Sequence, residues 1–176
     1  IGRFGNPVPE KWRFAVRLYH GSNVKIDSIN LAMCRPYKDF GKGFYLTDMK
    51  EQAEKMATRV ARIYGGFPVV STFEIDDNFR EFPEVRIMDF GVQTSEEWAK
   101  FVMNNRNRAF ADEKNVLCNQ DNKYDIVIGP VADDNMALLF RQYENEIIDF
   151  EILLKGLIYK RTSSQYSFHT EKGIRL

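Results

Sequence analysis

Short apolar runs and longer stretches with helical periodicity follow one another along this chain in irregular order. Runs rich in β-branched and aromatic residues, bounded by turn residues, predict strands at residues 16–19, 44–46, 69–75, 125–129 and 165–169. A 3.6-residue period predicts helices over about 49–64, 94–108, 134–143 and 147–158. Because these strands and helices do not alternate regularly, we expect an α+β fold.

The helix expected near residue 49 has a defined start and an apolar face. Asp48 stands three residues before Glu51, the spacing of a capping box, so Asp48 is expected to cap the helix. Met49 and Met56 share the apolar face with alanines at helical spacing. We expect both methionines to pack in the core against the preceding strand.

Composition points to one globular domain with a sizeable core. The 176 residues are 44% hydrophobic and 14% aromatic, which excludes the disordered and coiled-coil classes. Glycine and proline crowd together near the start, which predicts an N-terminal extension over residues 1–16 and a single domain over residues 17–176. The chain opens on Ile1 rather than Met, so we expect either a trimmed chain or part of a longer polypeptide.

Hydropathy, cysteines and charge limit the environment and the partners that we expect. No run reaches the roughly 18–20 apolar residues of a spanning helix, so no membrane partner is expected. Cys34 and Cys118 stand far apart without a CxxC partner, which predicts neither a disulfide nor a zinc site and favours a cytoplasmic location. The 25 basic and 25 acidic residues cancel, so a nucleic acid is a less favoured partner than a protein or a small molecule.

Few catalytic constellations can be built from these residues. With only two histidines, His20 and His169, a Ser-His-Asp or Cys-His apparatus has few ways to form. The chain has no HExxH motif, Cys/His cluster or Walker loop, so neither a metal site nor a phosphate loop is expected. Three separate elements remain, which are LYHGS at residues 18–22, DFGKGFYLT at 39–47 and QYSFHT at 165–170.

In this order the three elements resemble the signature of the ADP-ribosyltransferase superfamily, in the branch shared by diphtheria-toxin-like enzymes and poly(ADP-ribose) polymerases. The His-Gly of the first motif falls on His20-Gly21, the motif tyrosine on Tyr45, and the catalytic glutamate position on Gln165. The amino-acid sequences of the three motifs are most similar to those of a prokaryotic family of unknown function in that clan. The resemblance implies a split β-core of two antiparallel sheets with flanking helices, and NAD as the substrate without a metal.

The resemblance also implies a role for each matched residue in binding NAD. The backbone of Gly21 would approach the nicotinamide carboxamide, since no Cβ intervenes, and His20 would bind a ribose hydroxyl with Ser22 as a second contact. Tyr45 would stack on the nicotinamide ring. The expected catalytic set is therefore His20, Tyr45 and Gln165.

Two further NAD contacts are expected around the second motif. Gly43, together with Gly41, would let the chain turn tightly before Tyr45. The polymerases place a serine and a tyrosine for nicotinamide in the following helix, where this chain offers Gln52 instead. Gln52 is therefore expected to replace the contact with the carboxamide.

The neutral amide of Gln165 is the main departure from the superfamily pattern. A glutamate accepts a hydrogen bond from the nicotinamide ribose and stabilises the positive charge that develops there. An amide can accept the hydrogen bond but stabilises the charge only weakly. We therefore expect a mono-ADP-ribosyltransferase, acting as a toxin or effector on an acceptor that the sequence leaves open. A toxin would need a neutralising, antitoxin-type partner. An NAD-binding module with little or no turnover and an NAD glycohydrolase are the alternatives.

Overall fold

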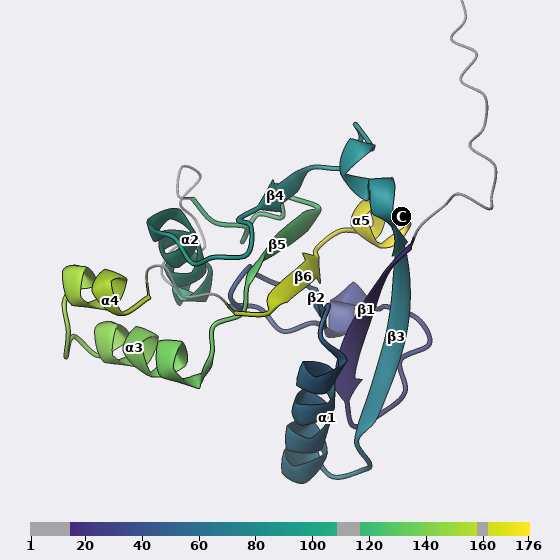
Figure 1. The fold of residues 1–176 in the computed structure, drawn as a ribbon, viewed down its shortest axis with the longest axis horizontal. Helices are drawn as coiled ribbons and strands as arrows, with labels where there is room; N and C mark the ends of the chain where they lie inside the picture. The colour runs from purple at the N-terminus through teal and green to yellow at the C-terminus, as the bar shows by residue number, and fades with distance from the viewer. Residues whose placement is uncertain (1–14, 109–116, 158–161) are drawn as a thin grey trace, which may run out of the picture.

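The computed structural model describes residues 15–108, 117–157 and 162–176 and confirms the α+β class (Figure 1). Residues 15 and 16 of the expected N-terminal extension belong to the first strand, and the rest of that extension lies outside the described residues. The strands are β1 Ala15–Ser22, β2 Phe44–Thr47, β3 Val69–Asp76, β4 Ile87–Asp89, β5 Ile126–Pro130 and β6 Ser164–Phe168. The helices are α1 Lys50–Tyr64, α2 Glu96–Arg106, α3 Asp134–Glu144, α4 Phe150–Leu157 and α5 Glu171–Ile174, with 3₁₀ turns at Leu31–Met33 and Asp77–Glu81.

The six strands form a single mixed sheet in the order β3-β1-β2-β6-β5-β4. Neighbouring strands are antiparallel except β4 and β5, which are parallel. The expected division into two antiparallel sheets is therefore not confirmed. The sheet nevertheless has a narrow junction, because β1 pairs with β3 over its whole length but with β2 only at Tyr19 and Thr47.

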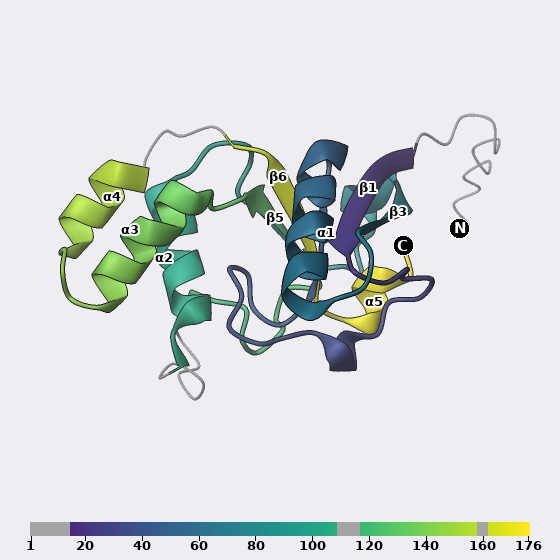
Figure 2. The ribbon, with the colours of Figure 1, turned by 90° about the horizontal axis from the view of Figure 1, so that it is seen from below.

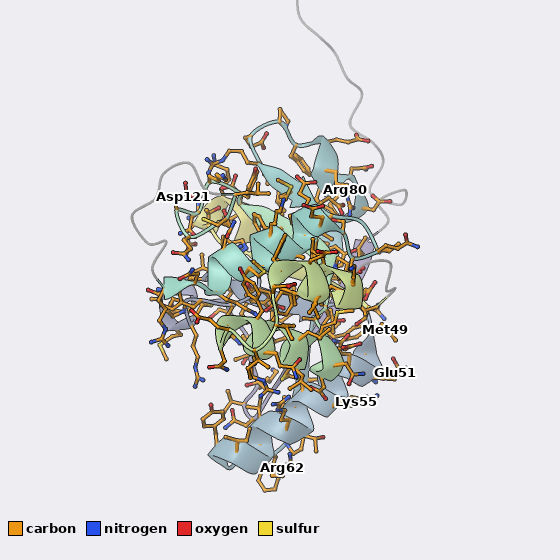
Figure 3. The ribbon with its side chains drawn as sticks, turned by 90° about the vertical axis from the view of Figure 1, so that its left-hand side faces the viewer. Met49, Glu51, Lys55, Arg62, Arg80 and Asp121 are labelled. Carbon is orange, nitrogen blue, oxygen red and sulfur yellow. The ribbon has the colours of Figure 1, made fainter. Side chains whose placement is uncertain are left out.

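Helix α1 lies along β1 and β3, while α2, α3 and α4 gather at the other end of the sheet (Figures 1 and 2). The side of α1 that faces the sheet is made of alanines, which are Ala53, Ala57 and Ala61. Met49 and Met56 are 46% and 48% exposed, so the expectation that both methionines are core residues is wrong. Figure 3 shows Met49 at the start of the helix that carries the charged side chains of Glu51, Lys55 and Arg62.

Two hydrophobic cores cover the two faces of the sheet. Neighbouring residues of β2 contribute to different cores, as the alternation of side chains along a strand requires. Tyr45 packs against the core formed with α2, α3 and α4, whereas Phe44 and Leu46 belong to the core on the opposite face. The first core is built around Phe40, Trp98, Phe101, Val127, Met136, Phe140, Leu153 and Leu157, and the second around Leu18, Ile75, Phe79, Ile126, Ile128 and Phe168.

The start of α1 differs from the expected capping box. The N-cap residue is Met49, and it makes no side-chain capping hydrogen bond. The Thr47 hydroxyl instead accepts a hydrogen bond from the Met49 N–H at 3.2 Å. This bond forms the turn between β2 and α1, so the helix begins one residue later than Asp48 would set it, and the expectation that Asp48 caps it is wrong. No helix in the described ranges has the length and apolar character needed to cross a membrane.

Candidate functional site

The three motifs occupy β1, β2 and β6, which are adjacent strands of the sheet. Thr47 in β2 links them, since it pairs with Tyr19 of β1 on one side and with Gln165 of β6 on the other. His20 follows Tyr19 directly, at the point where the pairing of β1 with β2 ends. The structure therefore brings the strands of His20, Tyr45 and Gln165 together at the narrow junction of the sheet.

The His20 ring crosses this junction and is anchored at one nitrogen. Its Nδ1 lies 2.8 Å from the Tyr45 carbonyl oxygen, and the ring stacks on Phe44 with centroids 4.4 Å apart. A carbonyl only accepts hydrogen bonds, so Nδ1 carries the proton and Nε2 of the neutral ring is an acceptor. Burial, partly opposed by the hydrogen bond to Tyr45, lowers the pKa of His20 and favours this neutral form. Nε2 has no hydrogen-bond partner among the residues that the structure describes.

The next two residues of β1 differ in how tightly they are held. A Cβ on Gly21 would lie 2.0 Å from the Ala53 carbonyl oxygen of α1, so only glycine lets the strand and the helix approach this closely. The side chain of Ser22 is only half-buried. Its Oγ makes a single long contact, at 3.5 Å, with the Asn23 side chain. Gly21 thus has a packing role beside its expected NAD contact, and the Ser22 hydroxyl is weakly engaged.

The Tyr45 hydroxyl is used entirely within the protein. It donates to the Gly41 carbonyl at 2.8 Å and accepts from the Phe40 N–H at 2.9 Å. Burial, reinforced by the nearby Asp39 carboxylate, raises the pKa of Tyr45 well above its usual value. Tyr45 is therefore suited to act as a fixed aromatic wall and not as a proton donor.

The two glycines of the second motif have different roles. Gly41 has a φ of +95°, so it provides the turn that was expected of both. Gly43 leaves room for His169, because a Cβ there would lie 2.6 Å from the His169 Nδ1. The buried His169 ring lies 2.8 Å from the Lys42 carbonyl through Nδ1 and 2.8 Å from Ser167 Oγ through Nε2.

The Gln165 amide has a fixed orientation. Its Nε2 donates to the Asp39 carboxylate at 3.2 Å and to the Pro130 carbonyl at 3.3 Å. Both partners can only accept, so the NH₂ group must face them and Oε1 must point the other way. Oε1 has no hydrogen-bond partner within the described ranges, and it is not among the enclosed side-chain atoms that lack one. Although Gln165 is only 8% exposed, it therefore offers a free acceptor.

Asp39 is a neighbour of Gln165 that we did not expect from the sequence. Arg106 of α2 holds its Oδ1 through Nη2 at 2.7 Å and Nε at 2.9 Å. The Asp39 side chain is 17% exposed and the Arg106 side chain 22%. Asp39 opens the DFGKG run, so an acidic residue next to the glycine motif was the available signal, whereas nothing in the sequence marked Arg106.

Gln52 lies in the first turns of α1, beside the start of β6. Its Oε1 accepts hydrogen bonds from the hydroxyls of Thr47, at 3.3 Å, and Ser163. In this arrangement the Gln52 Nε2 has no partner in the part of the chain that the structure describes. Gln52 is thus placed at the same junction, with an amide donor available.

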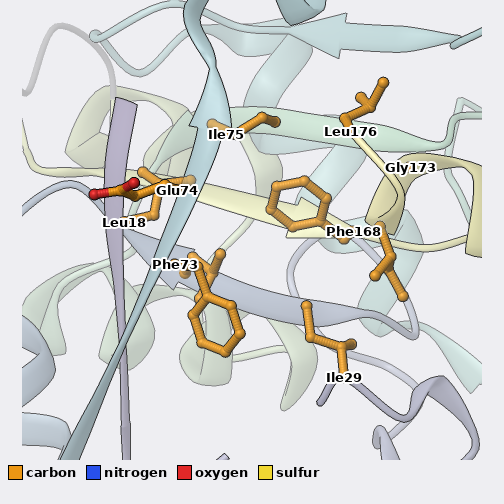
Figure 4. Close-up of a pocket in the computed structure, with 10 residues that line it drawn as sticks. Leu18, Ile29, Phe73, Glu74, Ile75, Phe168, Gly173 and Leu176 are labelled. Carbon is orange, nitrogen blue, oxygen red and sulfur yellow. The ribbon is translucent and has the colours of Figure 1, made fainter. Parts of the chain in front are cut away.

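Two hollows in the surface lie away from the residues expected to bind NAD. One of about 50 Å³ is lined mainly by apolar side chains, including Leu18, Phe73 and Phe168 (Figure 4). The other, of about 840 Å³, lies between α2 and the segment after α3, and Arg106 is on its wall. Neither is lined by a residue expected to bind NAD. Across the described residues, no group of three or more His, Cys, Asp or Glu side chains could hold a metal ion.

Comparison with known proteins gives one match. The model of a family described as "Protein of unknown function (DUF3990)" matches residues 16–176. No curated protein and no solved structure matches the chain. The matched range extends from β1 to α5, so it includes all three motifs and every residue of the candidate site.

Proposed function

Since the chain belongs to the DUF3990 family, whose function is unknown, we propose a function from its residues: a mono-ADP-ribosyltransferase that uses NAD as its substrate. The observation that carries the proposal is the meeting of three motifs on adjacent strands. His20, Tyr45 and Gln165 come from distant parts of the sequence, yet β1, β2 and β6 are neighbours in the sheet. The order of these motifs along the chain resembles the ADP-ribosyltransferase signature.

The free groups at the junction complement the groups that NAD presents. The His20 Nε2 and the Gln165 Oε1 are acceptors, as binding of ribose hydroxyls requires. The Gln52 Nε2 is a donor, as the carboxamide oxygen of nicotinamide requires. The Tyr45 ring, held in place through its hydroxyl, provides an aromatic surface for the nicotinamide ring.

The reaction replaces one bond to the nicotinamide ribose with another. The bond between C1 of that ribose and the nicotinamide nitrogen breaks, and nicotinamide leaves with the electron pair. A nucleophile of the acceptor bonds to C1 and loses its proton, which gives the ADP-ribosylated product. The neutral side chain of Gln165 favours transfer of a single unit over polymer synthesis.

The acceptor in this proposal is a protein or a small molecule. Zero net charge gives the chain no broad attraction for a polyanion, so a nucleic acid is less favoured. With water as the acceptor the same reaction would be NAD hydrolysis. Acting on the proteins of its own cell, the enzyme would be a cytoplasmic toxin and would need a neutralising partner.

A second candidate function follows from the amide at position 165. An amide stabilises a developing positive charge less than a carboxylate does, so the same site would also suit a module that binds NAD or ADP-ribose without turnover. Such a module would bind NAD through the same residues as the enzyme. The two functions differ in the release of nicotinamide.

Incubation of the purified chain with NAD labelled in its adenylate half, with and without a cell lysate, tests the proposal. We expect nicotinamide release and labelled protein with the wild type, and loss of both with His20→Ala. Lys55→Ala, on the exposed side of α1, is the matched control and should behave as the wild type (Figure 3). NAD binding without nicotinamide release would favour the binding module. Absence of both would overturn the proposal.

A further inference from the structure

We infer that Asp39 is a positioning residue of the proposed NAD site, and that it fixes Gln165 with its amide oxygen turned toward the substrate. This inference rests on the proposed function. The carboxylate that the superfamily pattern places at position 165 is then found one hydrogen bond away, on the loop before Phe40. Gln165 and Asp39 together form the unit that faces the ribose.

The two oxygens of Asp39 have separate tasks. Oδ1 accepts both hydrogen bonds from Arg106, and Oδ2 accepts the hydrogen bond from Gln165. If Asp39 served only to tie its loop to α2, the contacts of Oδ1 with Arg106 would be sufficient. The second oxygen is instead directed at Gln165, which it reaches from 126 positions away in the sequence.

The surroundings of Gln165 exclude the opposite orientation of its amide. A flipped amide would place Oε1 against the Asp39 carboxylate and the Pro130 carbonyl, at the positions that Nε2 now occupies. Three oxygens without a proton between them repel one another, and the buried NH₂ group would lose both acceptors. Asp39 therefore keeps the amide oxygen available for a hydroxyl of the substrate.

The same contact increases the negative charge on the amide oxygen. A hydrogen bond from Nε2 to a carboxylate is charge-assisted, and it polarises the amide toward its oxygen. Burial of Gln165 strengthens this effect, because the local dielectric is low. The amide therefore transmits part of the Asp39 charge to the ribose that binds it.

The pair also explains why glutamate does not suit position 165 in this chain. A carboxylate introduced there would face the Asp39 carboxylate and the Pro130 carbonyl at hydrogen-bond distance, with no donor between them. Glutamine at position 165 and aspartate at position 39 thus fit each other. A change at one position should be compensated by the reciprocal change at the other.

A four-protein cycle tests this inference with wild type, Asp39→Asn, Gln165→Glu and the double variant. For nicotinamide release we expect Gln165→Glu and Asp39→Asn each to lower kcat by about tenfold or more, with a smaller change in the Kd for NAD. In the double variant, the amide introduced at position 39 can donate to the carboxylate at 165, so kcat should return to within a few-fold of the wild type. Asp89→Asn, in the more exposed Arg80–Asp89 pair, is the matched control and should leave kcat unchanged.

Chemical unfolding of the same four proteins without NAD gives an independent reading. We expect each single variant to be less stable than the wild type and the double variant to recover most of the loss. A gain of kcat in Gln165→Glu, or a double variant no better than the worse single one, would overturn the inference. If the wild type neither binds nor cleaves NAD, the proposed function fails. The unfolding measurements then still test whether Asp39 and Gln165 interact. Losses of unfolding free energy that simply add up in the double variant would overturn that interaction.

Discussion

The two histidines of the chain share the same first contact and differ in the second. His20 and His169 each place Nδ1 2.8 Å from a backbone carbonyl of the glycine motif, Tyr45 and Lys42 respectively. The His169 Nε2 is engaged by Ser167, whereas the His20 Nε2 has no partner within the described residues. His169 is buried directly after β6, and His20 is half-buried within β1, two residues before the strand ends.

This difference separates a histidine that supports the fold from one that is open to a ligand. Anchoring one ring nitrogen on a carbonyl fixes the tautomer in both cases, so neither the anchor nor the tautomer distinguishes them. The second nitrogen distinguishes them, because a ring with both nitrogens engaged can bind nothing else. The comparison predicts that loss of His169 affects stability most and that loss of His20 affects NAD binding most.

The largest effect is expected from His169→Ala. The change opens a cavity behind Gly43 and removes a partner from the buried Ser167 hydroxyl, so the free energy of unfolding should fall by about 3 kcal/mol. Urea denaturation followed by circular dichroism measures this loss, with His20→Ala as the matched control. Equal losses for the two variants would remove the distinction between the two sites.

A smaller effect is expected from acid, through the same ring. Burial lowers the pKa of His169 from 6.5 to about 4. Below about pH 6.5 the unfolded chain therefore binds a proton that the folded chain does not bind until about pH 4. Near pH 5 the free energy of unfolding should for this reason be about 2 kcal/mol lower than at neutral pH. Burial also lowers the pKa of His20, which adds a loss of the same sign.

Unfolding curves between about pH 8 and pH 5 measure this dependence. In His169→Asn the slope should become shallower, because the titrating group is absent, while a contribution from His20 stays. A wild-type denaturation midpoint that does not change over this range would contradict the assignment of His169 as a buried neutral ring.

The smallest effect on stability is expected from His20→Ala. The variant loses one hydrogen bond and the stacking on Phe44 at a half-buried position, so the unfolding free energy should fall by only about 1 kcal/mol. The Kd for NAD should rise by about tenfold or more, since the free acceptor is gone. Calorimetric titration with NAD measures the affinity. An unchanged Kd with a large loss of stability would assign both histidines to the fold.

The strands of the motifs could be predicted from sequence because each combines a short apolar run with an adjacent turn. The buried residues of α1 could not be predicted in the same way. Hydropathy favoured Met49 and Met56 as core residues, but the sheet approaches α1 so closely at Gly21 that only alanines such as Ala53 and Ala57 fit between them. Periodicity identifies the apolar face of a helix, whereas the distance between the helix and the sheet decides which residues of that face are buried.

The Asp39 contacts could not be predicted from the sequence, because the residues that make them are far apart along the chain. Arg106 is 67 positions from Asp39, and Gln165 is 126 positions from it. No local pattern encodes such a meeting, which depends on the packing of α2 and β6 around the glycine motif. The parallel pairing of the three-residue strand β4 with β5 is equally non-local.

The pairing of β2 with β6 also sets the order in which the candidate site can form during synthesis. Thr47 and the Ser164 carbonyl that it contacts are separated by 117 positions, so a long loop must close before the two strands meet. A nascent chain that has left the ribosome only as far as β5 carries His20 and Tyr45 but lacks the strand of Gln165. For the toxin proposed above, such an arrangement would delay assembly of the site until β6 has been translated.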